Sequence, residues 1–306
     1  AASKPVNEVA QIFDRNLLRR RRDRAAPNFD DFDFLARRVG ELTADCLEDI
    51  RRQFPTALEL GCRTGQMAEI LQGRSGIETL VQSDLSEAMA SRAKGGAGGL
   101  TIAADEEALP FAEQSFDLVI SCLALHWVND LPGALIQIRR ALKPDGLFLA
   151  AFMGGATLAE LRAALLDAET EMEGGASPRV SPFAAVRDGG DLLQRAGFAL
   201  TVANTESLEV SFPSPAALLA DLRGMGETNA TIQRRRSFMR KSTLARAMAL
   251  YQERHGDSGG RITATFEIIF LTGWAPGPGQ SQPLAPGSGQ VSLTKALSGD
   301  GNQGGD

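Results

Sequence analysis

The sequence predicts an α/β fold built on a mostly parallel sheet with helices on both faces. Residues 57–67 contain a short apolar run, a turn with two glycines and the start of a helical pattern. This is the layout of a strand, a tight loop and a helix N-terminus. Predicted strands and helices then alternate through residues 56–152, which is typical of a parallel sheet. Acidic residues follow successive strands, at the edge where such sheets bind ligands.

The first strand–turn–helix unit carries Glu59 at the end of the strand and Gly61 and Gly65 in the turn. Glycine has no Cβ, so the backbone can pass close to a ligand at these positions. The spacing is not the Gly-x-Gly-x-x-Gly of dinucleotide-binding folds. No Gly-Lys-Ser/Thr follows the turn, which excludes a P-loop.

Two further acids follow the next predicted strands. Residues 77–81 form the second strand, and Asp84 lies just beyond it, about 20 residues after the turn. A carboxylate in this position can accept the hydroxyl groups of a ribose. Asp105 follows a third strand at 101–104. The fourth strand is predicted at 115–121 and the fifth is entered from 142–146.

In this order the motifs resemble class I S-adenosylmethionine (SAM) dependent methyltransferases. The motifs are Glu-x-Gly-x-x-x-Gly (59–65), Asp84, Asp105, Leu-Pro-Phe (109–111), Ser-Phe-Asp-Leu-Val (115–119) and Leu-Lys-Pro-Asp-Gly (142–146). The resemblance implies a Rossmann-like fold with a mostly parallel seven-stranded sheet whose last strand is antiparallel. It also implies an N-terminal helical extension and a helical cap insertion.

The same resemblance implies that SAM is the cofactor. Residues 59–65 would hold its methionine end, Asp84 its ribose and Asp105 its adenine edge. The implied cofactor contacts are Glu59, Gly61, Cys62, Gly65, Asp84, Leu85, Asp105, Glu106 and Ser121. One position departs from the family pattern. Arg63 stands where the family usually has glycine, and a side chain there would crowd SAM unless it points outward.

Composition limits the classes of protein that fit. The chain has 306 residues, 43% of them hydrophobic and 23% charged, with a net charge of −6. This is ordinary for a globular protein, and the acidic balance does not favour nucleic acid as a partner. No apolar run approaches the roughly 20 residues of a transmembrane helix.

The three cysteines and the start of the chain bear on location. The cysteines are far apart, so neither a metal site nor a disulfide framework is expected and a reducing compartment is favoured. No signal peptide is visible, but the chain begins without Met, which leaves a removed targeting segment open. We expect a cytoplasmic protein, or a mitochondrial matrix protein in a eukaryote.

The expected organisation has three parts. Residues 1–55 form a helical extension, with helices at 6–24 and 30–54, expected to cover the ligand cleft. Residues 56–274 form the SAM-binding domain, with a helical insertion at about 214–258. Residues 275–306 are rich in Gly, Pro, Ser and Gln and are expected to be a disordered tail.

Two basic runs, Arg19–Arg22 and Arg234–Arg236, each have two interpretations. Runs of charge are usually solvated faces. The alternative for the first run is a clamp over the ligand. For the second it is a docking site for an acidic partner such as an acyl carrier protein.

The segment after the fourth strand contains the candidate catalytic residues His126 and Trp127. In SAM enzymes this segment faces the transferred methyl group. Histidine titrates near neutrality, so His126 suits proton removal. The alternative is that both side chains close the pocket by packing. Asp130 is predicted to cap the helix that follows.

Further stretches resemble one subfamily. They include Ile-Phe-Asp-Arg (12–15), His-Trp-Val-Asn-Asp-Leu-Pro-Gly (126–133), Gly-Gly-Ala-Thr-Leu (154–158), Ser-Pro-Arg-Val-Ser-Pro-Phe (177–183) and Gly-Met-Gly-Glu (224–227). Together they are similar to the mitochondrial complex I assembly factor 5 family and its bacterial relatives. The mitochondrial member is implicated in hydroxylating an arginine of a complex I iron–sulfur subunit. Malonyl-acyl carrier protein methyltransferases are more distant relatives.

Three functions therefore stay open. The first is methyl transfer from SAM to a small-molecule, carrier-bound or protein acceptor. The second is arginine hydroxylation of a complex I iron–sulfur subunit. An iron oxygenase normally uses two histidines and a carboxylate, and this chain has only His126 and His255, far apart in sequence. The third is a non-enzymatic role for bound SAM. The sequence predicts no oligomeric state.

Overall fold

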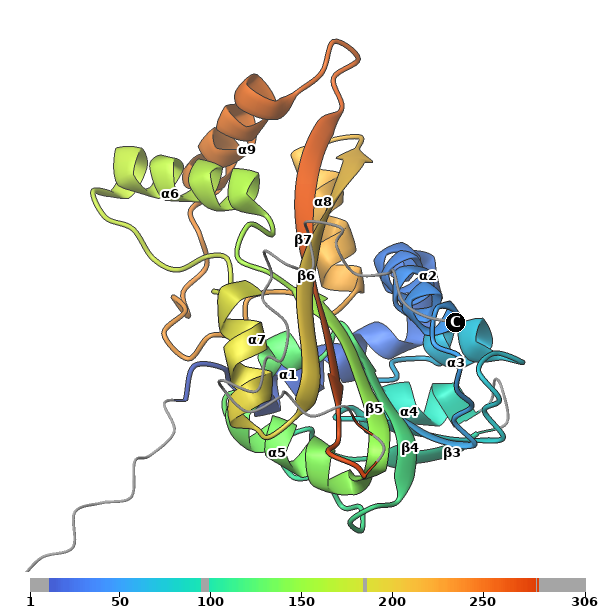
Figure 1. Cartoon of the computed structure of the whole chain (residues 1–306). Helices are drawn as coiled ribbons and strands as arrows, with labels where there is room; N and C mark the ends of the chain where they lie inside the picture. The colour runs from blue at the N-terminus through green and yellow to red at the C-terminus, as the bar shows by residue number, and fades with distance from the viewer. Residues whose placement is uncertain (1–10, 95–98, 184–185, 279, 281–306) are drawn as a thin grey trace, which may run out of the picture.

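The computed structural model describes residues 11–94, 99–183, 186–278 and 280. A seven-stranded sheet runs through the molecule in the order β3-β2-β1-β4-β5-β7-β6 (Figure 1). All pairs are parallel except those of β7, which is antiparallel to both neighbours. The predicted fold class is confirmed. The strands are β1 (Thr56–Leu60), β2 (Thr79–Asp84), β3 (Leu100–Ala103), β4 (Phe116–Cys122), β5 (Leu142–Met153), β6 (Ala199–Phe212) and β7 (Ile262–Trp274).

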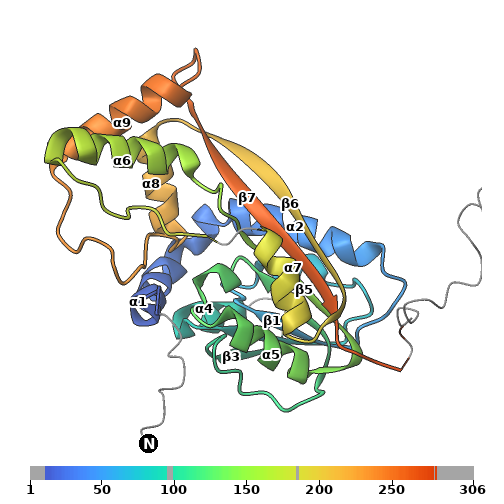
Figure 2. The ribbon, with the colours of Figure 1, turned by 60° about the vertical axis from the view of Figure 1, so that its left-hand side comes forward.

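Helices cover both faces of this sheet (Figure 2). The α-helices are α1 (Arg15–Ala25), α2 (Phe34–Glu48), α3 (Gln66–Leu71), α4 (Glu87–Lys94), α5 (Leu131–Ala141), α6 (Ala159–Glu173), α7 (Val186–Arg195), α8 (Pro215–Gly224) and α9 (Lys241–His255). Two short 3-10 helices complete the described elements: η1 (Ala26–Phe32) lies between α1 and α2, and η2 (Leu125–Trp127) lies between β4 and α5.

Alternate strand residues enter two separate hydrophobic cores, because successive side chains of a strand point to opposite faces. Leu147 and Leu149 of β5 pack in the core that contains α2, α6, α8 and α9. Phe148 and Ala150 pack in the core that contains α5 and α7. Burial on both faces explains why these strands are almost wholly apolar.

The helical cap, which is the insertion at about 214–258 with α8 and α9, lies at the far end of β6 and β7. These two strands extend beyond the other strands (Figure 1). There α6 packs against α9, and Tyr251 of α9 donates a hydrogen bond to the carbonyl of Thr263 at 2.9 Å. The predicted helical insertion at about 214–258 contains two helices, α8 and α9. Residues 225–240 between them include a bridge from Thr231 to Phe13.

The ends of the chain differ partly from the prediction. Within the described residues the first helix begins at Arg15, where the Asp14 side chain caps the amide of Leu17 at 2.9 Å, so residues 11–14 of the helix predicted at 6–24 are not helical. Residues 1–10 lie outside the described residues. So do 279 and 281–306, which form most of the predicted disordered tail. At the start of that tail, Ala275 still forms backbone hydrogen bonds with Asp145 and Gly146.

Candidate functional site

Four acidic side chains gather at the carboxyl ends of the first three strands. Glu59, Asp84 and Glu106 are buried, whereas the side chain of Asp105 is 35% exposed. The chain reverses its strand order between β1 and β4, and ligands of open α/β sheets bind at such switch points. The structure therefore brings together the acids that the sequence placed at one edge.

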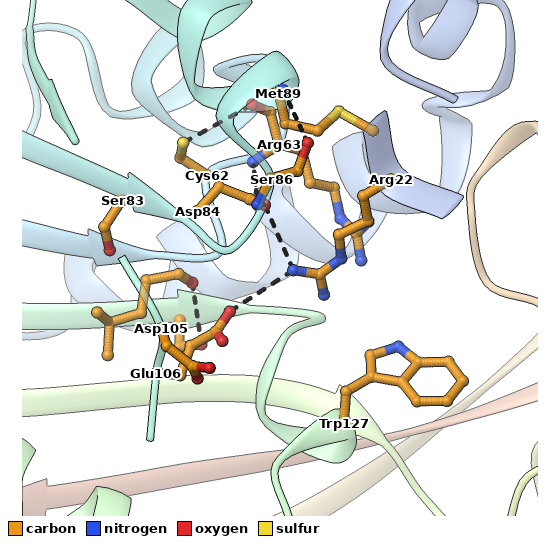
Figure 3. A network of polar contacts seen from close by, with 12 residues as sticks. Arg22, Cys62, Arg63, Ser83, Asp84, Ser86, Met89, Asp105, Glu106 and Trp127 are labelled. Carbon is orange, nitrogen blue, oxygen red and sulfur yellow. Dashed lines mark hydrogen bonds and ion pairs between the residues drawn. The ribbon is translucent and has the colours of Figure 1, made fainter. Parts of the chain in front are cut away.

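Asp84 is the best-connected of these acids (Figure 3). Its Oδ2 accepts a hydrogen bond from the backbone amide of Arg63 at 3.1 Å, and its Oδ1 accepts one from the amide of Ser86 at 2.8 Å. The guanidinium of Arg22 approaches Oδ1 at 3.5 Å. The carboxylate thus ties the glycine turn to the loop after β2.

The glycine turn is held by packing against the protein itself. A Cβ on Gly61 would lie 2.3 Å from the Cβ of Ala124, and the φ of Gly61 is +78°. Arg63 adopts φ +50°, a left-handed conformation that favours glycine and costs a larger residue about 1–2 kcal/mol. The family preference for glycine at this position therefore has a backbone reason.

The side chain of Arg63 does not point outward. It is buried, with 4% exposed, and its Nη2 donates to Glu227 at 2.6 Å and to the carbonyl of Leu123 at 2.7 Å. Its guanidinium carbon lies 5.6 Å from the ring centre of Phe29.

Glu227 is the centre of a second buried cluster. Besides Arg63, it accepts hydrogen bonds from the indole nitrogen of Trp127 at 2.6 Å and from Nε2 of His126 at 3.3 Å. The imidazole of His126 also packs edge-on against Phe183, at 5.7 Å between ring centres. Both candidate catalytic residues are therefore fixed by one carboxylate from the segment after α8.

Helix α1 lies over the acids and supplies two arginines. Arg15 forms ion pairs with Asp105 and Glu106, and Arg22 lies between Asp84 and Glu106 (Figure 3). The segment before the helix is anchored by Asn129, whose side-chain oxygen accepts from the amides of Ile12 and Phe13 at 2.8 and 2.7 Å.

Burial and neighbouring charge shift the pKa values of the site in different directions. Burial raises the pKa of Glu59 to about 8, with only a hydrogen bond from Gln82 opposing it. Burial also acts to raise the pKa of Glu106, but Arg15 and Arg22 outweigh it and hold that pKa below its usual value. Glu106 is therefore charged at neutral pH, while Glu59 is largely protonated.

The Glu227–His126 pair has a defined charge state. Burial acts to raise the pKa of Glu227, but Arg63 and His126 lower it well below its usual range. Burial lowers the pKa of His126, and Glu227 only partly opposes this shift. A neutral imidazole beside a carboxylate carries its proton on Nε2, where it donates to Glu227, so Nδ1 is left as the acceptor.

The remaining predicted cofactor contacts have mainly structural partners. The hydroxyl of Ser121 donates to the carbonyl of Leu60 at 3.1 Å. Cys62 is buried, and Leu85 packs against a small cluster that contains Phe13 and Trp127. Gly65 has φ +102° and starts α3. These positions shape the turn and its surroundings.

The site residues predicted from the sequence do not include Arg15, Arg22, Asn129 or Glu227, although a clamp over the ligand was one interpretation of the run that contains Arg22. Arg22 belongs to the basic run that was interpreted first as a solvated face, yet it is fully buried, while Arg19 and Arg20 of the same run are exposed. Helical spacing gives a signal for Arg15 and Arg22, because residues seven apart share one face. In the second run, Arg234 and Arg235 form ion pairs with Asp14, Glu169 and Glu173.

The polar groups suit a zwitterionic nucleoside such as SAM. Within the described residues, several buried polar atoms of the site lack a hydrogen-bond partner. They are Nε of Arg15, Nε and Nη2 of Arg22, Nη1 of Arg63, Oε1 of Glu106 and Nδ1 of His126. Buried polar groups are nearly always paired. Donors of this kind match a carboxylate, and the acceptors match hydroxyl or amino groups.

Two kinds of feature are absent from the described residues. They contain no group of three or more His, Cys, Asp or Glu side chains placed to hold a metal ion. None of the helices in the described ranges combines the length and the apolar character needed to cross a membrane.

Comparison with known proteins gives consistent matches. The family described as methyltransferase domain matches residues 58–150. The chain is 42% identical to the protein named arginine-hydroxylase NDUFAF5, mitochondrial, of Danio rerio, over 92% of this chain and 88% of that protein. It is 34% identical to the malonyl-[acyl-carrier protein] O-methyltransferase of Halorhodospira halophila, over 93% and 95%.

A solved structure shows the same fold. The YcgJ protein of Bacillus subtilis aligns with a TM-score of 0.54 at 15% identity, over 78% of this chain and 98% of that chain.

Proposed function

The chain belongs to the NDUFAF5 arginine-hydroxylase family, within the class I SAM-dependent methyltransferases, and on this basis we propose that it modifies arginine side chains of a protein partner. It is an enzyme, and its cofactor is SAM. The acids at the ends of β1 to β3 hold that cofactor. The cluster around Glu227 faces the acceptor.

The observation that carries the proposal is the way this cluster already binds a guanidinium group. The guanidinium of Arg63 contacts the carboxylate of Glu227, the carbonyl of Leu123 and the ring of Phe29. A carboxylate, a carbonyl and an aromatic face are the groups that recognise arginine. Trp127 and His126 border the same carboxylate. An arginine side chain of a partner protein binds next to Arg63, beside the same carboxylate and aromatic side chains.

Methyl transfer is the reaction that the described side chains support best. The acceptor nitrogen attacks the methyl carbon of SAM, the carbon–sulfur bond breaks, and S-adenosylhomocysteine leaves. The protein mainly has to align the two reactants, which can supply about 7–11 kcal/mol. His126 takes the proton of the acceptor through Nδ1, because its Nε2 is held by Glu227. No metal ligand is required.

Arginine hydroxylation is the second candidate, and the similarity to proteins named arginine-hydroxylase NDUFAF5 favours it. This reaction adds an oxygen atom and consumes an oxidant. Under this alternative the cofactor site retains SAM, and the Glu227 cluster retains its role of binding the acceptor guanidinium.

Peptide mass spectrometry distinguishes the two reactions. The iron–sulfur subunits of respiratory complex I are compared between source cells with and without the gene, and arginine peptides are sequenced. Loss of a methyl group from one arginine in the deletion strain supports methyl transfer. Loss of one oxygen supports hydroxylation. Unchanged arginines in all subunits would contradict a complex I acceptor.

A variant separates a direct effect from failed assembly. Cells that carry only His126→Asn are compared with cells that carry the wild-type gene, because asparagine keeps a polar side chain and removes the imidazole base. We expect the arginine modification to be lost while the variant protein remains folded, as shown by its unchanged circular dichroism. Full modification of the arginine in this strain would show that the reaction does not require His126.

A further inference from the structure

Arg22 has the least complete set of partners among the arginines of the site. Its side chain is fully buried, and its Nη1 lies 3.5 Å from Oδ1 of Asp84 and 3.6 Å from Oε1 of Glu106. These contacts are long for charge-assisted hydrogen bonds, which are usually 2.7–2.9 Å. Its Nε and Nη2 have no partner in the described part of the chain.

The other two arginines of the site are held more firmly. Arg15 forms short ion pairs with Asp105 and Glu106 and also donates to the carbonyl of Trp127 at 3.3 Å. Arg63 is bound by Glu227 and Leu123 at 2.6 and 2.7 Å. Arg22 is therefore the cation of the site that is best able to exchange its partner for a ligand.

The position of Arg22 matters for the cofactor. Its guanidinium lies between Asp84, the acid assigned to the ribose, and Glu106, a predicted cofactor contact next to Asp105 (Figure 3). A ribose can bind to Asp84 only if Arg22 moves away from that carboxylate. A buried guanidinium that leaves one anion needs another, because an unpaired buried charge is strongly destabilising.

We propose that Arg22 binds the carboxylate of the amino-acid half of the cofactor, and that it leaves Asp84 to do so. The inference rests on the assignment of SAM as the cofactor and goes beyond it by naming the residue that recognises its carboxylate. Both unpaired N–H groups of Arg22 belong to the planar fork that pairs with carboxylates in a bidentate manner. The carboxylate of the cofactor then replaces Asp84 as the anion that pairs with Arg22.

This exchange makes Arg22 a specificity residue. A nucleoside that lacks the carboxylate leaves Arg22 on Asp84, where it competes with the ribose. A nucleoside that has the carboxylate draws Arg22 away and frees Asp84. Adenosine compounds without the amino-acid half therefore bind weakly.

Calorimetric titration tests the inference with two ligands that differ in one group. S-Adenosylhomocysteine and its decarboxylated analogue are titrated into the whole chain. We expect the wild-type protein to bind the carboxylate-bearing ligand at least about 10-fold more tightly, as a hydrogen bond to a charged group predicts. In Arg22→Met this difference shrinks to about twofold or less.

The matched control is Arg20→Met, because Arg20 lies on the same helix but is exposed. This variant keeps the wild-type difference between the two ligands. Binding of the decarboxylated analogue to Arg22→Met shows that the variant is folded. If that variant does not fold, Arg22→Lys serves in its place, with a difference smaller than that of the wild type because lysine lacks the planar fork.

Three outcomes overturn the inference. The first is that Arg22→Met keeps the full difference in affinity between the two ligands, because another group would then recognise the carboxylate. The second is that Arg22→Met binds both ligands more tightly and by the same factor, because Arg22 would then only block the site. If neither ligand binds the wild-type protein, the cofactor assignment fails as well. If Arg22 discriminates between the two ligands but no arginine of the partner is modified, the cofactor inference stands and only the proposed acceptor is overturned.

Discussion

At Glu59, burial and hydrogen bonding act on one carboxyl group in opposite directions. Glu59 lies in β1 directly opposite Gln82 of the neighbouring strand β2, and its side chain accepts a hydrogen bond from Gln82 at 3.0 Å. Burial nevertheless dominates and raises the pKa to about 8, from the ordinary value of 4.5. Folding therefore favours the protonated carboxyl.

This shift predicts a pH-dependent effect of Glu59→Gln. The folded state binds the proton of Glu59 more tightly than the unfolded state, so the contribution of Glu59 to the stability of the wild-type protein falls as the pH rises from about 4.5 to about 8. Glutamine has no proton to lose. We expect the free energy of unfolding of the variant, relative to wild type, to rise by about 1–4 kcal/mol over that interval.

Denaturant unfolding at several pH values measures this difference. Glu78→Gln is the control, because Glu78 is exposed at the edge before β2, and its difference from wild type is expected to stay constant. Parallel pH profiles for Glu59→Gln and wild type would show that Glu59 is ionised in the folded protein.

Glu227 compensates the charge of a buried arginine. Glu227→Gln leaves the guanidinium of Arg63 without its counter-charge, and breaking a buried ion pair in this way destabilises by about 3–5 kcal/mol. Glu171→Gln breaks an exposed pair with Arg246 and is expected to cost about 1 kcal/mol or less. Chemical denaturation of both variants at neutral pH compares them. Equal losses would mean that the Arg63–Glu227 pair contributes no more than a surface pair.

At this scale the sequence indicates some residues of the site and conceals others. Asp84 and Asp105 can be found because each directly follows a strand. Arg22 and Glu227 cannot, because their significance depends on partners 62 and 164 residues away in the chain. Helical spacing places Arg22 on the same face of α1 as Arg15, but nothing in the local sequence shows that this face is the one that covers the acids.

Helix α1 connects local capping to the cofactor site. Asp14 ends the extended segment and caps the amide of Leu17, and its other oxygen pairs with Arg234 at 3.4 Å. The helix predicted at 6–24 was wrong for residues 11–14, because Phe13 pairs with Thr231 in an antiparallel bridge, which a helix cannot do. That bridge joins segments more than 200 residues apart, which no local pattern reveals.

Asp14→Ala is therefore expected to lower both stability and cofactor affinity. Loss of an N-cap costs about 0.5–2 kcal/mol. Because α1 also carries Arg15 and Arg22, looser docking of the helix weakens binding of S-adenosylhomocysteine by about 3-fold or more. Thermal unfolding and calorimetry measure the two effects.

The control removes a similar cap from another helix. Asp130 accepts from the amide of Gly133 at 2.9 Å and starts α5, which carries no residue of the cofactor site. Its predicted capping role is confirmed. Asp130→Ala is expected to lower stability by a similar amount and to leave affinity unchanged. Equal affinity losses in the two variants would contradict a specific role of α1.

Over the whole molecule, the sheet was the most predictable part. The alternation of strands and helices predicts a parallel sheet, and the family resemblance implies that the last strand is antiparallel. The order β3-β2-β1-β4-β5-β7-β6 and the antiparallel pairing of β7 confirm both. The cap was less predictable. Residues 225–240 were expected within a helical insertion, but their contacts with the segment before α1 keep part of them extended.

The assembled molecule places segments from both ends of the chain over one edge of the sheet. Helix α1 comes from the N-terminal extension and contacts Asp84 at the end of β2 through Arg22, whereas Glu227 comes from the cap and contacts Arg63 in the turn after β1. The central claim is that this assembly is the cofactor site, with Asp84 as the carboxylate that binds the ribose.

Calorimetric titration of S-adenosylhomocysteine into wild type, Asp84→Asn and Asp117→Asn tests this claim most directly. Asp117 is a matched acid at the opposite edge of the sheet, where it accepts from the amide of Thr56 at 3.0 Å and from Lys143 at 2.9 Å. We predict that Asp84→Asn weakens binding about 10- to 100-fold, as loss of charged hydrogen bonds implies, and that Asp117→Asn leaves it unchanged. Wild-type affinity in Asp84→Asn would contradict the account.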